Sequence, residues 1–187
     1  MRKVPVTAGG AAGMMAAVTA AKNGGQVLLL EKNEKLGKKL FITGKGRCNI
    51  TNAAEIEEFF SAVVSNPKFL YSSFYSFTND QVIDFFEKLG VQTKVERGGR
   101  VFPASDHSSD VIRALEREMG RLGVKIRLRT EVKELIVEDG TVKGALLSSG
   151  KKLYADAVII TTGGVSYPST GSTGDGYRFA RECGHKV

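Results

Sequence analysis

The sequence has few of the residues on which covalent or metal-based frameworks depend. Only two cysteines occur in 187 residues, Cys48 and Cys183, and they lie far apart with no C-x-x-C pair. Neither a disulfide scaffold nor a zinc site is indicated. Tryptophan is absent, and no apolar run approaches the ~20 residues of a membrane span. The first residues lead into glycine-rich sequence instead of a signal peptide, so we expect a cytoplasmic protein without a membrane partner.

The charge balance narrows the kinds of ligand. Apolar residues make up 42% and charged residues 25%, which is ordinary for a globular protein and excludes a disordered or collagen-like chain. The excess of 27 basic over 20 acidic residues gives a net charge of +7, which favours nucleic acid, a membrane surface or small anions such as phosphates. A solvated loop is the ordinary explanation of a basic cluster. Here one acidic residue, Glu34, stands among Lys32, Lys35, Lys38, Lys39, Lys45 and Arg47.

The first thirty residues have the pattern of a β-α-β unit. A short strand at 3–7 is followed by a glycine turn at 8–13 and an Ala- and Met-rich helix at 14–23. The apolar run 26–30 is typical of a parallel strand buried on both faces, and Glu31 closes it. This is the minimal mononucleotide-binding piece of a doubly wound fold.

The remaining pattern predicts an α/β, Rossmann-like domain with a parallel sheet, a helical insert and a small antiparallel β-meander. We divide it into 1–53 (the β-α-β unit and a glycine-rich loop), 54–122 (the helical insert) and 123–187 (a third strand, the meander, a last strand and a helix). Phenylalanines and tyrosines between 59 and 86 predict a small helical core. Further elements are expected at 91–102 (short strands), 106–122 (helix), 124–129 (strand), 132–154 (meander), 157–160 (buried strand) and 176–183 (helix).

The turn at 8–13 has the spacing of a dinucleotide-binding fingerprint. Gly10 lets the backbone approach a pyrophosphate, Gly13 permits close packing of helix on strand, and Glu31 follows Gly10 by 21 positions, where a carboxylate can hold ribose hydroxyls. Ala8 replaces the first glycine and is tolerated if its φ is negative, whereas a positive φ would cost about 1 kcal/mol. Pro5 interrupts a strand that should be central, although proline is normally confined to sheet edges.

Two further segments carry chemistry. In the stretch 37–49, glycines at 44 and 46 let the backbone approach a ligand, and Lys38, Lys39 and Arg47 can neutralise phosphate charge. No Gly-Lys-Ser/Thr opens a helix, so this is not a Walker A motif. The segment 158–164 ends a strand in Thr-Gly-Gly at the sheet edge where α/β ligands bind, and Asp175 after it could simply be a helix N-cap.

These segments, in this order, resemble the FAD-binding half of glutathione-reductase-like and fumarate-reductase-like flavoproteins. They are most similar to a bacterial family of FAD-dependent oxidoreductases described as aminoacetone-oxidase-like or NAD(FAD)-utilising dehydrogenases. The resemblance spans essentially the whole chain and is carried by residues 9–14, 30–32, 37–39, 44–52, 99–103, 162–164 and 173–177. The string Gly-Arg-Cys-Asn-x-Thr-Asn at 46–52 is its most specific part.

The resemblance implies a noncovalently bound FAD. Its cofactor-binding residues would be Gly10, Ala11, Ala12, Gly13, Glu31, Lys32, Lys39, Gly44, Gly46, Arg47, Cys48, Asn49, Val132, Thr162, Gly163, Gly164 and Asp175. The turn at 10–13 would hold the pyrophosphate, Glu31 the ribose, Val132 the adenine through its backbone, and the 44–49 loop would run along the flavin. Members are about twice as long, and we expect the substrate domain to lie outside this sequence.

The resulting hypothesis is a flavoprotein oxidoreductase that transfers hydride through FAD to or from a small molecule, with NAD(P)H as a candidate redox partner and no catalytic residue identified. Without C-x-x-C, a disulfide relay is not available. Cys48 is better explained as a small packed residue than as a redox thiol. Two alternatives remain: a nucleic-acid-binding or RNA-modifying flavoprotein, which the arrangement of basic and aromatic residues disfavours, and an NAD-dependent dehydrogenase without flavin.

Overall fold

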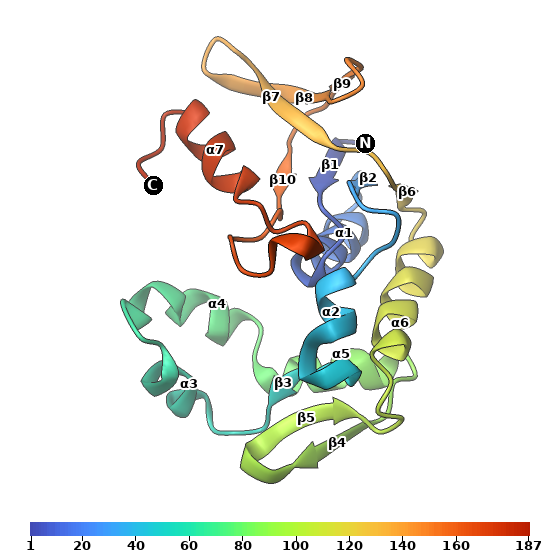
Figure 1. Ribbon diagram of the computed structural model, residues 1–187, viewed down its shortest axis with the longest axis vertical. Coiled ribbons are helices and arrows are strands. Elements are labelled where there is room, and N and C mark those ends of the chain that lie inside the picture. Colours follow the sequence, from blue (N-terminus) through green and yellow to red (C-terminus); the bar gives the residue numbers. More distant parts are fainter. The chain divides into compact units, whose positions relative to one another are not determined.

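The computed structural model describes residues 1–187 and divides into two compact units (Figure 1). The first unit combines residues 1–40 with 115–187, and the second covers 41–114. The inserted unit therefore includes the glycine-rich loop, which the sequence analysis grouped with the β-α-β unit. The short helix α2 (Lys38–Ile42) and the long helix α6 (Ser108–Arg121) each cross a boundary between the units.

The first unit is built on a four-stranded parallel sheet in the order β10-β1-β2-β6. The strands are β1 (Lys3–Thr7), β2 (Gln26–Leu30), β6 (Lys125–Arg127) and β10 (Ile159–Ile160). Helix α1 (Ala11–Lys22) connects β1 to β2 and begins three residues earlier than the sequence pattern suggests. This strand order, with a helical crossover between parallel neighbours, confirms the predicted Rossmann-like α/β fold.

Strand β10 is shorter and more exposed than the buried strand expected at 157–160. The difference relates to Pro5. Within β1 the odd-numbered residues face β10: the Asp156 amide donates to Lys3 O and the Thr161 amide to Thr7 O. Pro5 faces the same side but has no N–H to donate. The strand β10 pairs only with the last two residues of β1, Val6 and Thr7, so Pro5 lies just before the paired residues and its missing N–H is accommodated in a central strand.

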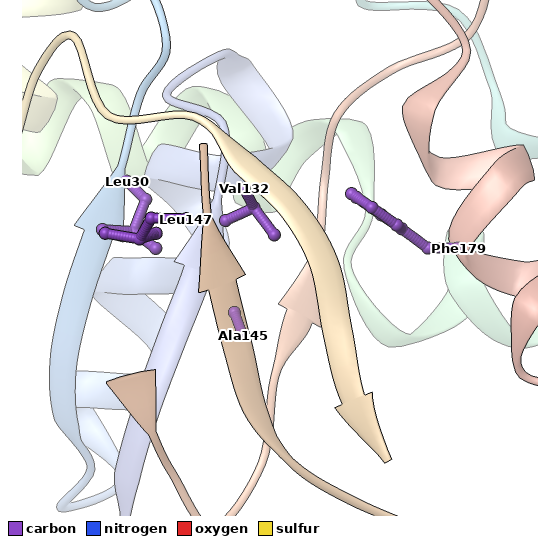
Figure 2. Close-up of a cluster of buried hydrophobic side chains, with 5 residues drawn as sticks. All are labelled: Leu30, Val132, Ala145, Leu147 and Phe179. Atoms are coloured by element: carbon purple, nitrogen blue, oxygen red, sulfur yellow. The ribbon is translucent and has the colours of Figure 1, made fainter. Parts of the chain in front are cut away.

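The predicted meander forms a three-stranded antiparallel sheet of β7 (Val132–Glu138), β8 (Thr141–Leu147) and β9 (Lys152–Tyr154). After β10 the chain passes through a short 3-10 turn, Pro168–Thr170, into α7 (Asp175–Glu182). Figure 2 shows the cluster that joins these parts: Leu30 from β2, Val132 from β7, Ala145 and Leu147 from β8, and Phe179 from α7. Each of these side chains is buried, so the meander and α7 are anchored to the end of β2 by apolar packing.

The second unit contains the antiparallel sheet β3-β5-β4 and several short helices. Its elements are η1 (Thr43–Gly46), β3 (Thr51–Asn52), α3 (Ile56–Ala62), η2 (Pro67–Leu70), α4 (Tyr71–Ser76), α5 (Asn79–Lys88), β4 (Thr93–Glu96), η3 (Arg97–Gly99), β5 (Arg100–Pro103) and the start of α6. Helix α5 begins with a capping box between Thr78 and Gln81. Val101 and Phe102 of β5 are among the fully buried side chains of this unit, together with Cys48 and Val111.

The expectation of a small helical core in the aromatic stretch is wrong. Helices α3 and α4 bury no residue, and Phe86 of α5 is the one aromatic side chain between 59 and 86 that is buried. The rings do gather on one another, with the centroids of Phe60 and Tyr71 4.3 Å apart. They remain in contact with solvent, and Phe69 is 78% exposed. Helical spacing of aromatics predicted the helices, but it does not specify which surface covers them.

Candidate nucleotide-binding site

The turn between β1 and α1 presents unoccupied backbone donors. Gly10 is the N-cap of α1, no side chain caps the helix, and its first turn has no acidic residue. The first intrahelical bond runs from the Met14 amide to Gly10 O, at 3.0 Å. The amides of residues 11–13 therefore have no acceptor within the helix, and the positive end of the helix dipole lies beside them. This is a favourable environment for a phosphate.

The three glycines of the turn differ in what a side chain at each position would contact. A Cβ on Gly9 would lie 2.2 Å from Leu36 Cδ2, and one on Gly13 would lie 1.7 Å from Ala8 O. A Cβ on Gly10 would meet nothing within 4 Å, and the φ of Gly10 is −77°, which any residue can adopt. Neither the packing nor the backbone of this chain requires a glycine at position 10. A glycine at this position would allow a bound group to approach the backbone closely.

Ala8 adopts the less favourable of the two conformations considered from the sequence, with a φ of +78°. Its backbone is fixed on both sides. The Ala8 amide donates to Leu30 O at 2.7 Å, and its carbonyl accepts a hydrogen bond from Thr161 Oγ1 at 3.2 Å. The strain of a left-handed alanine, about 1 kcal/mol, is therefore present in the folded state.

Glu31 is 5% exposed and connects the turn to the loop after β2. One carboxylate oxygen accepts from the Gly9 amide at 2.6 Å. The other accepts from the Asn33 amide at 2.7 Å and from Asn33 Nδ2 at 2.6 Å. A carboxylate has about four acceptor positions, so about one remains for a further donor such as a ribose hydroxyl.

The loop after β2 is held to the loop before α7 by Lys32. Its ammonium group donates to Thr173 Oγ1 at 2.7 Å and to Asp175 Oδ2 at 2.8 Å. Burial opposes ionisation of Asp175, but the hydrogen bonds from Lys32 and Thr173 outweigh it and lower the pKa of this carboxyl group. Gly174, and not Asp175, is the N-cap of α7. Asp175 therefore acts as the ion-pair partner of Lys32, which excludes the simple capping role considered from the sequence.

Lys39 joins the same two loops without a carboxylate partner. Its ammonium group donates to Ser172 Oγ at 2.6 Å and to Ser166 O at 2.8 Å, both of which are neutral. Near this lysine, the Gly37 amide donates to Gly9 O at 2.9 Å and so ties the lysine-bearing loop to the glycine turn. The first unit therefore holds a positive charge without a counter-ion on the segment bound to the turn, an arrangement suited to an anion.

The end of β10 contributes an unsatisfied polar group. Thr161 Oγ1 donates to Thr7 O, whereas Thr162 Oγ1 is buried and has no hydrogen-bond partner. Gly163, with a φ of +74°, then turns the chain. Buried hydroxyls are normally paired, so Thr162 is a candidate for contact with a ligand.

The side chain of Val132 packs in the apolar cluster of Figure 2. Two residues before it, the Thr130 amide donates to Glu31 O at 2.9 Å.

The other predicted binding residues lie in the second unit, in the loop 43–49. Arg47 Nη1 pairs with Glu96 Oε1 at 2.8 Å and with Asp106 Oδ1 at 3.3 Å. In the orientation that satisfies its surroundings, the amide nitrogen of Asn49 donates to Thr51 O and Val101 O, at 3.0 and 3.2 Å. Burial raises the pKa of the Cys48 thiol, which is fully buried. This is the environment of a packed residue, as the sequence favoured, and not of a reactive thiolate.

The sequence reasoning missed several partners of the predicted residues. Asn33 and Thr161 stand next to predicted site residues and could have been found from their polar side chains. Ser172, Glu96 and Asp106 could not, since only the folded chain brings them to Lys39 and Arg47.

The sequence of this chain is similar to those of known proteins. The chain is 38% identical over 190 residues to the 3-dehydro-bile acid delta(4,6)-reductase of Clostridium scindens, covering 100% of this chain and 45% of the relative. It is 33% identical over 179 residues to a ribosomal RNA dihydrouridine synthase of Escherichia coli, covering 95% and 43%. The chain thus spans less than half of either relative. No helix has the length and apolar character needed to cross a bilayer.

The fold itself recurs in an open-form flavocytochrome c3 fumarate reductase, with a TM-score of 0.65 and 22% identity, covering 97% of this chain and 40% of that protein. A family model described as "HI0933-like protein Rossmann domain" matches residues 2–187. Since that match covers nearly the whole chain and confirms the resemblance drawn from the motifs, the chain belongs to the HI0933-like family and represents its Rossmann domain.

Proposed function

We propose that the first unit binds FAD noncovalently and that the chain is the cofactor-binding part of an oxidoreductase acting on a small molecule. The observation that carries the proposal is the environment of Gly10. Neither its backbone conformation nor any neighbouring protein atom would prevent a side chain at this position, yet the residue is glycine. The relative of Clostridium scindens, which matches the whole chain, is named a reductase, and this supports the reaction class. FAD supplies hydride transfer when it is bound, and the protein contributes binding and orientation.

The residues of the first unit have the chemistry that this cofactor needs. The free amides at 11–13 suit its pyrophosphate, and Glu31 keeps about one acceptor position for a ribose hydroxyl. Lys39 offers a positive charge without a counter-ion, and Thr162 offers a buried hydroxyl without a partner. The loop after Glu31 contains no histidine, which is consistent with a noncovalent cofactor. The part taken by residues 44–49 remains a prediction from the sequence.

The test is cofactor binding by the purified protein. We expect flavin absorbance bands, and mass spectrometry of the denatured protein should release FAD. Gly10→Ala should weaken FAD binding by about tenfold or more, because the added methyl group occupies the approach to the pyrophosphate. Gly120→Ala is the matched control, since a Cβ at Gly120 also meets nothing within 4 Å. A protein that stays colourless with added FAD, or equal FAD affinity in both variants, would refute the proposal.

Two outcomes would direct attention to the alternatives. Binding of a nicotinamide dinucleotide without flavin, measured by competition titration, would favour an NAD-dependent dehydrogenase. Steeply salt-dependent binding of an oligonucleotide by the FAD-loaded protein would favour an RNA-modifying flavoprotein. The second candidate is supported by the similarity to the ribosomal RNA dihydrouridine synthase and by the charge of +7.

A further inference from the structure

The glycine-rich loop of the second unit has a strained backbone. Besides Gly44 and Gly46, two residues with side chains adopt left-handed conformations: Lys45 has a φ of 59° and Cys48 a φ of 62°. In a left-handed conformation the Cβ atom of a residue lies too close to its own backbone. Such residues persist only where the surrounding structure fixes their conformation. Local hydrogen bonds contribute, since the Cys48 amide donates to Thr43 O at 3.0 Å. A turn of this length needs further anchors.

Arg47 provides the anchor that reaches farthest along the sequence. Its guanidinium pairs with Glu96 at the end of β4 and with Asp106 just after β5. The same group lies over the ring of Phe102, with Cζ 4.1 Å from the ring centroid. Phe102 is fully buried and in turn sits 2.9 Å from where a Gly44 Cβ would be. One side chain thus ties the middle of the loop to both strands of the β4–β5 hairpin and to the turn that follows.

The charge of Arg47 is neutralised within this cluster. Lys94 pairs with Asp106 and lies 3.6 Å from Glu96, so two cations face two carboxylates. The hydrogen bond from Arg47 lowers the pKa of Glu96, and the hydrogen bond from Lys94 lowers the pKa of Asp106. Both carboxylates are therefore ionised at neutral pH, and the guanidinium has no excess charge to offer to a phosphate.

We infer that Arg47 is a positioning residue, which holds the strained loop 43–49 on the β4–β5 hairpin through Glu96, Asp106 and Phe102, and is not a ligand of a bound anion. This differs from the role that the sequence suggested for Arg47 as a cofactor-binding cation. The FAD titration described next rests on the proposed function. The hydrogen–deuterium exchange of the loop does not depend on any cofactor.

The test compares Arg47→Ala, the carboxylate variant Glu96→Ala/Asp106→Ala, and the triple variant that combines these changes. Hydrogen–deuterium exchange of residues 43–50 in the full chain reports the loop itself, and FAD titration reports binding. Arg113→Ala is the matched control, because Arg113 is an exposed cation of the same unit whose loss changes the net charge equally. Thermal unfolding verifies that every variant is folded.

Arg47→Ala and Glu96→Ala/Asp106→Ala should each accelerate exchange in the loop by on the order of tenfold, and the triple variant should be little worse, because the changes remove the same ion pairs. Any loss of FAD affinity should occur in both variants and be absent in Arg113→Ala. An FAD affinity lowered by Arg47→Ala but not by Glu96→Ala/Asp106→Ala, which leaves the guanidinium in place, would overturn the inference and assign Arg47 to the ligand. Unchanged loop exchange in Arg47→Ala would also overturn it. A wild-type chain that binds no FAD would refute the proposed function alone.

Discussion

Replacing Ala8 by glycine should stabilise the protein, which is unusual for a change that removes a side chain. Ala8 has a φ of +78°, and its backbone is held by Leu30 O on one side and Thr161 on the other, so it cannot relax. A left-handed alanine costs roughly 1–2 kcal/mol. Glycine removes that cost but increases the entropy of the unfolded chain by roughly 0.4–1 kcal/mol. The expected net gain is about 0.5–1 kcal/mol, or an increase in Tm of about 1–4 °C for a chain of this size.

Thermal unfolding and urea titration measure this gain, and the urea m-value should not change. Ala16→Gly is the matched control, since Ala16 is also half-buried but lies within α1. The same chemical change should lower stability there by about 1 kcal/mol, because glycine is a poor helix former. If Ala8→Gly lowers Tm as Ala16→Gly does, the reasoning about backbone strain at the turn is refuted.

Three further predictions concern ionisable groups. The hydrogen bond from Arg121 lowers the pKa of Glu118 to about 2. The ionised carboxylate therefore stabilises the fold fully above the ordinary glutamate pKa, and this stabilisation is lost as the pH falls toward 2. Urea titrations at several pH values should show that Glu118→Gln abolishes this part of the acid dependence. Asp175→Asn should break the pair with Lys32 and accelerate hydrogen exchange at 164–175, and lowering the pH of the wild type through the depressed Asp175 pKa should have the same effect. A thiol reagent should modify native Cys48 far more slowly than the other cysteine, because Cys48 is fully buried and burial raises its pKa. Equal rates for the two thiols would contradict this.

The parts of the fold that depend on local sequence were predicted well. The glycine turn, the apolar run 26–30 and the Asp139-Gly140 turn each encode their own geometry, so the β-α-β unit and the meander follow from short stretches. The fingerprint also identified Gly10, whose environment supports the proposed cofactor site.

The parts that depend on distant partners could not be read in the same way. The length of β10 is set by where it meets β1, whose residues lie about 150 positions earlier. Arg47 looks like a ligand-binding cation in the sequence, and only the folded hairpin reveals its pairing with Glu96. The same holds for the aromatic residues of α3 and α4. Periodicity identifies the apolar face of a helix, but it does not show which part of the protein packs against that face.

The place of Pro5 has a consequence for how this chain is made. During synthesis β1, α1 and β2 can pair as soon as they leave the ribosome, but β10 follows only after residue 159 has been added. Until then, one side of β1 is an open edge to which another nascent chain could add a strand. A proline in the middle of that edge removes a donor such a strand would need. The proline therefore makes this edge of β1 a poorer template for strand addition while β10 is still missing.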